Sequence, residues 1–286
     1  MNQVKNIVNG FVKELQRKYG VATCELNITE EGSRIVIGGV MLTDKQKAIL
    51  DRRLQQAGER VEWRIVILAD QEPALGWAHV DKIPTNVWSR TLLQDHISWL
   101  STQVIIKEEP IKLLWQAKDF YCVQLVDATI GWIRAIELTR LAGAPSWIPP
   151  EQKASNRPEL LAYIDRWLDV PYLRGGLTYQ GVDCSGLTQN IYRHCFHYLL
   201  PRHSMDQLKV GHTVTEPKIG DLVFFEHHHE KTHHTTGHVG IVINAEAKLV
   251  AHANLTNGKV MQNMMSEMLA MGYEFLGYRN YDVEIF

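Results

Sequence analysis

The N-terminal part of the chain alternates between helix-like and strand-like patterns of apolar positions. In residues 3–18 apolar side chains recur every three or four positions, and Gly20 follows as a stop signal, which predicts a helix. Residues 22–29 and 34–40 read as two strands around a short turn. Residues 43–58 predict a second helix behind a Thr cap, and residues 61–69 a third strand.

This helix-strand-strand-helix-strand order over residues 1–72 resembles a BON domain, a small α/β module associated with envelope proteins. Pro and Gly residues at 71–84 then suggest a linker. Short alternating stretches follow, which predict many short strands over residues 80–142. With Arg90, the strand KDFYCVQLVD and the closing GWI, this region resembles a bacterial SH3 (SH3b) barrel.

Four prolines fall within residues 141–158 and block regular structure there, so we expect a Pro-rich linker at 143–158. A third domain then covers residues 159–286. It begins with a predicted helix that ends before Pro171. The predicted fold class is α+β.

Composition excludes several classes of protein. The chain is 45% hydrophobic and 22% charged with a formal net charge of -2, which gives no basic field for nucleic acid. No apolar window is long enough for a transmembrane helix, so we expect no membrane insertion. The charged, amphipathic start lacks the features of a secretory signal, which suggests a cytoplasmic protein, or an exported one whose signal was removed.

Cys184 differs in its surroundings from the other three cysteines. Cys24, Cys122 and Cys195 sit in apolar runs and read as buried free thiols. Cys184 follows a Gly-containing loop and opens a predicted helix over 185–199. The partial positive charge of a helix start favours a thiolate, so we expect a lowered pKa and a nucleophilic role.

Two histidines downstream offer a base for this thiol. His238 begins the predicted strand 237–243, and His252 lies in the next predicted strand, 248–253. A short turn between two strands predicts a hairpin, which would bring both imidazoles to one face. A nucleophile, a base and a third polar group that orients the base is the general triad arrangement.

Five landmarks in this region occur in a familiar order: PYLRGG, DCSG, LPRHSMDQ, GDLVFF and GHVG, followed by AHA. Together they resemble the NlpC/P60 family, whose domain is papain-like. The resemblance implies that Cys184 is the nucleophile, His238 the general base and His252 the third residue. It also places Tyr172 near the oxyanion. No cofactor is implied.

The resemblance also suggests substrate-binding residues. Asp183 and Ser185 match positions that bind the free amine of an N-terminal L-alanine, although Asp183 is equally suited to cap the helix. Arg174 stands where an aromatic residue is common and is a candidate for gripping a substrate carboxylate. Arg202 and Ser204 fit a structural role as well as a catalytic one. The His-rich tract 227–234 predicts a solvated loop rather than a metal site.

The combination with an SH3b-like domain resembles γ-D-glutamyl-L-diamino acid endopeptidases, so we expect a peptidoglycan-derived peptide as substrate and a role in cell-wall recycling. Three alternatives stay open: a wall-remodelling hydrolase, an amidase or acyltransferase on the same Cys–His scaffold, and a wall-binding protein without catalysis. The sequence does not fix the oligomeric state.

Overall fold

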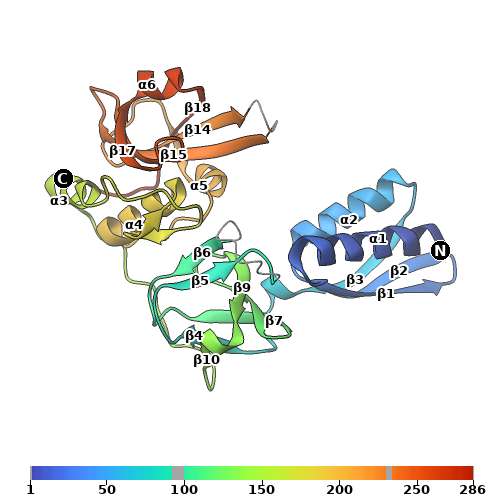
Figure 1. Cartoon of the computed structure of the whole chain (residues 1–286). Helices are drawn as coiled ribbons and strands as arrows, with labels where there is room; N and C mark the ends of the chain where they lie inside the picture. Colours follow the sequence, from blue (N-terminus) through green and yellow to red (C-terminus); the bar gives the residue numbers. More distant parts are fainter. Residues whose placement is uncertain (1, 92–99, 230–233, 286) are drawn as a thin grey trace. The chain divides into compact units, whose positions relative to one another are not determined.

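The structure is a computed structural model that describes residues 2–91, 100–229 and 234–285. The chain forms two compact units (Figure 1). The first comprises Met1–Val126 and Ile130–Trp147, and the second comprises Asp127–Thr129 and Ile148–Phe286. Helices and antiparallel strands occur in both, so the chain is a mixed α/β protein.

The first unit opens with the five elements that the periodicity predicts. They are α1 (Asn2–Tyr19), β1 (Cys24–Glu31), β2 (Arg34–Met41), α2 (Asp44–Gln56) and β3 (Val61–Ile67). Thr43 caps α2 by accepting a hydrogen bond from the Gln46 backbone, as expected for this residue type. β2 lies between β1 and β3 in a three-stranded sheet, and both helices pack their apolar stripes onto one buried cluster.

A seven-stranded sheet completes the first unit, in the order β10-β4-β7-β8-β9-β5-β6. Its strands are β4 (Trp77–Val80), β5 (Thr85–Trp88), β6 (Leu100–Val104), β7 (Ile111–Ala117), β8 (Phe120–Gln124), β9 (Ile130–Arg134) and β10 (Leu138–Arg140).

The predicted strand KDFYCVQLVD, residues 118–127, is wrong at its start, because residues 111–124 form a hairpin. Lys118 takes a left-handed φ of 52° and reverses the chain between β7 and β8. The division of residues 1–142 into two domains stays a prediction.

The second unit packs helices against a six-stranded antiparallel sheet in the order β13-β18-β14-β15-β16-β17. The helices are α3 (Arg157–Asp165), α4 (Cys184–Phe196), α5 (Ser204–Val210) and α6 (Met265–Ala270). The strands are β13 (His212–Val214), β14 (Leu222–His229), β15 (His234–Asn244), β16 (Leu249–Asn254), β17 (Lys259–Met264) and β18 (Tyr273–Asn280). A small hairpin, β11 (Leu177–Thr178) and β12 (Gly181–Val182), precedes α4.

One apolar core joins α3 and α4 to this sheet. Leu187, Ile191 and Cys195 recur along α4 and are fully buried, which is the stripe that the sequence predicts. Val239 and Ile241 of β15 face the same cluster. This shared core therefore packs α4 against the part of β15 that contains Val239 and Ile241. In the part of the chain that the structure describes, no helix combines the length and the apolarity needed to cross a bilayer.

Candidate active site

The motif Asp183–Cys184–Ser185–Gly186 builds the start of α4. Asp183 is the N-cap, and its Oδ1 accepts the Gly186 backbone N–H at 2.8 Å. Cys184 is therefore the first residue of the helix, as predicted. Gly186 is needed for space, because a Cβ there would lie 2.4 Å from the carbonyl oxygen of Gly176. The loop before the nucleophile and the helix behind it thus meet backbone to backbone.

Asp183 is also the centre of a buried ionic network. Arg202 donates from its two terminal nitrogens to the two carboxylate oxygens at 2.9 and 2.7 Å, and Gly175 N–H donates to Oδ2 at 2.7 Å. The same guanidinium reaches Ser185 Oγ at 2.9 Å. With the capping bond, each carboxylate oxygen accepts at least two hydrogen bonds. The capping role of Asp183 is confirmed, whereas amine recognition by Asp183 and Ser185 stays a prediction.

The Cys184 thiol is buried, and its environment corrects the expectation of a lowered pKa. Burial raises the pKa of Cys184 to about 12, and the negative charge of Asp183 acts in the same direction. Backbone hydrogen bonds from Val239 and Ser185 and the charge of Arg202 oppose this rise without outweighing it. Desolvation therefore raises the pKa of Cys184 by more than the position at the helix start lowers it. The raised pKa favours the protonated thiol near pH 7, so a nucleophilic role for Cys184 would require a group that accepts its proton.

His238 and His252 form the hydrogen-bonded pair expected from the hairpin. Strands β15 and β16 pair antiparallel, and His238 Nε2 lies 2.9 Å from His252 Nδ1. His252 Nε2 lies 3.0 Å from Asn263 Oδ1 on β17. Burial lowers the pKa of both imidazoles, and the neighbouring His252 lowers the pKa of His238 further. Both rings are accordingly neutral near pH 7, the state in which an imidazole accepts a proton.

A single pocket of about 290 Å³ collects most of the predicted site residues. Cys184 and His238 both line it, whereas His252 is fully buried and supports His238 from behind. The remaining lining residues are mostly polar: Tyr172, Arg174, Asp183, Ser185, His203, Ser204, His227, Thr236, Gly237, Leu255, Thr256 and Tyr273. The hydrogen-bonding side chains of this lining can contact the charged or polar groups of a substrate.

Two tyrosines flank the thiol. Burial raises the pKa of Tyr172 and of Tyr273, and the electrostatic influence of Cys184 raises both further, so each phenol stays a hydrogen-bond donor. Tyr172 is held by a 2.7 Å bond from its backbone N–H to the Gly258 carbonyl. The Tyr273 ring packs on His238 with centroids 4.8 Å apart. Arg174 is exposed at the pocket rim.

Sequence reasoning did not assign Tyr273, His203 or Asn263 to the site. Tyr273 begins a strand late in the chain and carries no motif. His203 follows Arg202 in the landmark LPRHSMDQ, and partial desolvation together with the positive charge of Arg202 lowers its pKa. Asn263 lies on the edge strand β17, where only the sheet register reveals its contact with His252.

The His-rich tract is not a plain loop. β14 and β15 stay paired out to His229 opposite His234, because the antiparallel ladder continues past the pocket. His227 faces Tyr273, with ring centroids 5.0 Å apart. Residues 230–233 lie outside the described residues. Within residues 2–91, 100–229 and 234–285, no group of three or more His, Cys, Asp and Glu side chains is arranged to hold a metal ion.

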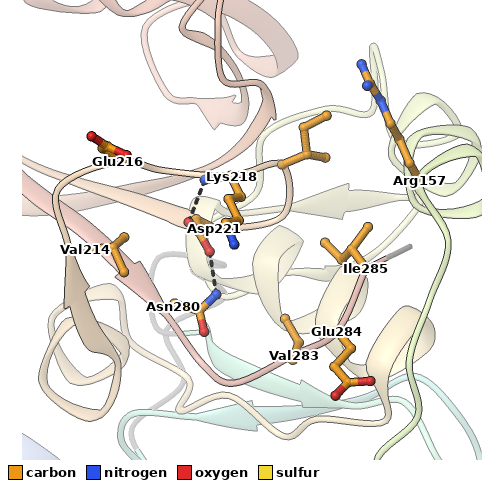
Figure 2. A pocket seen from close by; sticks show the side chains of 10 residues that line it. Arg157, Val214, Glu216, Lys218, Asp221, Asn280, Val283, Glu284 and Ile285 are labelled. Carbon is orange, nitrogen blue, oxygen red and sulfur yellow. Dashed lines mark hydrogen bonds between the residues drawn. The ribbon is translucent and has the colours of Figure 1, made fainter.

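A larger concavity of about 680 Å³ lies elsewhere in the second unit (Figure 2). Its wall carries Asp221, whose carboxylate accepts hydrogen bonds from the Lys218 backbone and the Asn280 side chain. Arg157 and Ile285 also line this concavity. Among the residues that the structure describes, its lining includes no cysteine, serine or histidine.

A cysteine at a helix start that shares a pocket with a histidine on a strand is an arrangement found in cysteine hydrolases. Residues 169–276 match the NlpC/P60 family, so the chain carries an NlpC/P60 family domain.

Known proteins similar to this domain include bacterial wall enzymes. The chain is 36% identical over 104 residues to the murein DD-endopeptidase MepS/murein LD-carboxypeptidase of Escherichia coli (strain K12), covering 36% of this chain and 51% of that protein. It is 34% identical over 97 residues to the gamma-D-glutamyl-L-lysine dipeptidyl-peptidase of Bacillus subtilis (strain 168), covering 32% of each. The match thus spans about half the length of the first relative and a third of the second.

Among solved structures, an NlpC/P60 family protein from Bacillus cereus ATCC 10987 is similar with a TM-score of 0.41 and 22% identity. The match covers 72% of this chain and 63% of that one.

Proposed function

We propose that this protein is a cysteine endopeptidase that hydrolyses the γ-D-glutamyl–diamino acid bond of peptidoglycan-derived peptides. The observation that carries the proposal is the Cys184 thiol, which shares one pocket with His238 while His252 supports that ring from behind. The names of the relatives from E. coli and B. subtilis support a wall peptide as the substrate class.

The chemistry follows from the neutral resting state of the site. As Cys184 Sγ attacks the γ-glutamyl carbonyl carbon, its proton passes to His238, and a thioester forms through a tetrahedral intermediate. His238 then protonates the leaving amine of the diamino acid. A water molecule, deprotonated by His238, hydrolyses the thioester and returns the thiol. Tyr172 and the backbone N–H at the start of α4 are our candidates for stabilising the oxyanion.

For substrate selection, we propose that the polar pocket accepts a short peptide with a free N-terminal L-alanine, as released during cell-wall recycling. Arg174, exposed at the rim, is the candidate partner for a substrate carboxylate. The networked Asp183 and Ser185 would contribute a polarised wall, with Arg202 balancing the charge of the carboxylate.

The test is a digest followed by mass spectrometry, with the wild type and Cys184→Ala side by side. The substrates are L-Ala-γ-D-Glu-meso-diaminopimelate, its N-acetylated form, a tetrapeptide ending in D-alanine, a cross-linked dimer, and intact sacculi. Release of diaminopimelate from the free tripeptide alone supports the proposal. Activity retained in Cys184→Ala would overturn it.

The other substrates separate a second candidate, which the similarity to the E. coli murein enzyme favours. Cleavage of the cross-linked dimer or of sacculi would indicate a wall-remodelling endopeptidase. Loss of the terminal D-alanine from the tetrapeptide would indicate a carboxypeptidase. Cleavage at the N-acetylmuramate amide would indicate an amidase.

We also propose identities for the folds. The seven-stranded sheet, which begins at Trp77 inside the predicted linker and ends at Arg140, is an SH3b-like barrel. The elements in residues 1–72 form a BON-like module, and the catalytic domain is papain-like. The short strands of the first and the α-β-β-α-β order of the second support this. Sedimentation of the full chain and of a variant lacking residues 1–72 with purified sacculi tests whether the first module binds the wall.

A further inference from the structure

A hydrogen-bond chain extends beyond the histidine pair to the start of α6. Glu267 Oε2 accepts the Asn263 side-chain Nδ2 at 3.0 Å and the Met264 backbone N–H at 2.7 Å. Asn263 Oδ1 in turn lies 3.0 Å from His252 Nε2. We propose that Asn263 and Glu267 are positioning residues that fix the proton positions on His252 and His238.

The direction of each hydrogen bond follows from what its groups can do. A carboxylate only accepts, so the Asn263 amide must turn its NH2 group toward Glu267. The carbonyl oxygen of Asn263 then faces His252 Nε2. Because that oxygen only accepts, His252 carries its proton on Nε2. A flipped amide would set its oxygen against the Glu267 carboxylate and its NH2 group against the His252 N–H.

The same donor–acceptor argument also fixes the tautomer of His238. A neutral His252 protonated on Nε2 has a bare Nδ1, which accepts a hydrogen bond from His238 Nε2–H across 2.9 Å. His238 is then left with an unprotonated Nδ1, the nitrogen that a general base needs. This inference rests on the proposed function, in which His238 takes the Cys184 proton.

The hydrogen bond between His252 and Asn263 is shielded from water. His252 is fully buried and Asn263 is 9% exposed, so bulk water does not compete for the bond between them. Glu267 is exposed and sits in the first turn of α6. Its bonds to Asn263 and Met264 lower the pKa of this carboxyl, which keeps it an acceptor. Glu267 therefore lies at the surface, and through its hydrogen bond it orients the buried Asn263 amide.

The direct test is the tautomeric state of the two rings in the unliganded full-length protein. ¹⁵N-histidine labelling and long-range ¹H–¹⁵N spectra distinguish protonated from bare ring nitrogens. The chain has 13 histidines, so His238→Gln and His252→Gln variants supply the assignments. The proposal expects Nε2–H on both rings in the wild type. A proton on Nδ1 of either ring would overturn it.

Asn263→Leu removes the acceptor while filling similar space. We expect His252 to lose its single tautomer, and kcat to fall about 10-fold or more with KM less affected, since a wrong tautomer costs up to about 10⁴-fold in a related triad. Gln262→Leu is the matched control, because its side chain points to the opposite face of β17. Equal losses in both variants, with unchanged spectra, would indicate a merely structural effect and contradict the proposal.

The sharpest variant exchanges donor and acceptor. Asn263→Asp combined with Glu267→Gln keeps an acceptor oxygen on His252 and lets the new amide donate to it. We expect the pair to keep the wild-type tautomers and most of kcat, whereas Glu267→Ala alone frees the Asn263 amide and broadens the tautomer signals. Wild-type spectra in Glu267→Ala would remove Glu267 from the proposal, and a swap that behaves like Asn263→Leu would refute the chain altogether.

These outcomes are separable from those of the proposed function. The spectra need no substrate, so they decide the tautomers even if none of the wall peptides is cleaved. Conversely, Asn263→Leu with full kcat and Cys184→Ala without activity would leave the peptidase proposal standing and reject the positioning role.

Discussion

Both oxygens of the Asp183 carboxylate, next in the chain to Cys184, are bound by the two terminal nitrogens of Arg202, at 2.9 and 2.7 Å. The Arg202 side chain is 2% exposed and that of Asp183 11%. Removing Arg202 would leave the charge of the buried Asp183 carboxylate without its partner. We expect Arg202→Met to lower the free energy of unfolding by about 3–5 kcal/mol, as is usual when a buried ion pair is broken. Urea denaturation at pH 7.5 measures this.

Arg174→Met is the control for the loss of a guanidinium at the same pocket, because Arg174 is exposed. Its stability should stay within about 0.5 kcal/mol of the wild type. Similar losses in both variants would mean that the Arg202–Asp183 pair does not bear the stability of this region.

Thiol reactivity should report the raised pKa of Cys184. We expect its iodoacetamide alkylation to be slow at pH 7 and its rate to keep rising above pH 9, because burial raises the pKa to about 12. Mass spectrometry of the Cys184 peptide gives the rate, and Cys184→Ala identifies background labelling at Cys24, Cys122 and Cys195. A rate that reaches its plateau below pH 7 would show a preformed thiolate instead.

Acid should destabilise the protein through its buried histidines. Burial lowers the pKa of the two buried imidazoles, His238 and His252. Below about pH 6.5 the unfolded chain therefore binds more protons than the folded one, and stability rises with pH. This stability is present above pH 6.5 and lost as pH falls through the folded pKa values.

Chemical denaturation between pH 5 and 7.5 measures this slope. His252→Gln should flatten it, while Leu255→Ala, which alters the pocket without removing an imidazole, should not. The acid limb of kcat/KM should likewise lie below pH 6.5, since His238 must be neutral to act as a base. An acid limb above pH 6.5 would contradict this assignment.

Two glycines at the site should respond differently to the same substitution. Gly186→Ala places a Cβ 2.4 Å from the backbone oxygen of Gly176, which cannot move without shifting the loop. We expect a loss of about 1–3 kcal/mol, although alanine is normally the better helix former. Gly237→Ala meets the flexible end of Met205 and should cost less. Thermal denaturation compares the two, and an equal or reversed order would contradict the packing argument.

The parts of the site that follow from local sequence were predictable. The stripe Leu187–Ile191–Cys195 and the Asp183 cap place Cys184 at a helix start, and a short turn pairs the strands of His238 and His252. Helix periodicity, capping and hairpin formation are short-range effects, so a single sequence suffices to infer them.

What escaped prediction depends on long-range contacts. The raised pKa of Cys184 reflects burial by segments far along the chain, which outweighs the local helix effect. Asn263 and Tyr273 reach the site only through sheet register and ring packing. The reversal at Lys118 was missed because a left-handed lysine carries no compositional signal comparable to Asn-Gly or Asp-Gly.

The turn between β16 and β17, residues 255–258, sets the alignment of much of the pocket. Gly258 in this turn accepts the Tyr172 backbone N–H, and the pairing of Asn254 with Lys259 fixes which residues of β17 share a face with His252. Side chains alternate faces along a strand, so one inserted residue here would turn Asn263 away from His252 and displace the Tyr172 anchor. Length variation among natural relatives should therefore be rare at this turn and freer at the far end of the β14–β15 hairpin. The length of this turn therefore determines the geometry of the pocket as directly as the side chains that line it do.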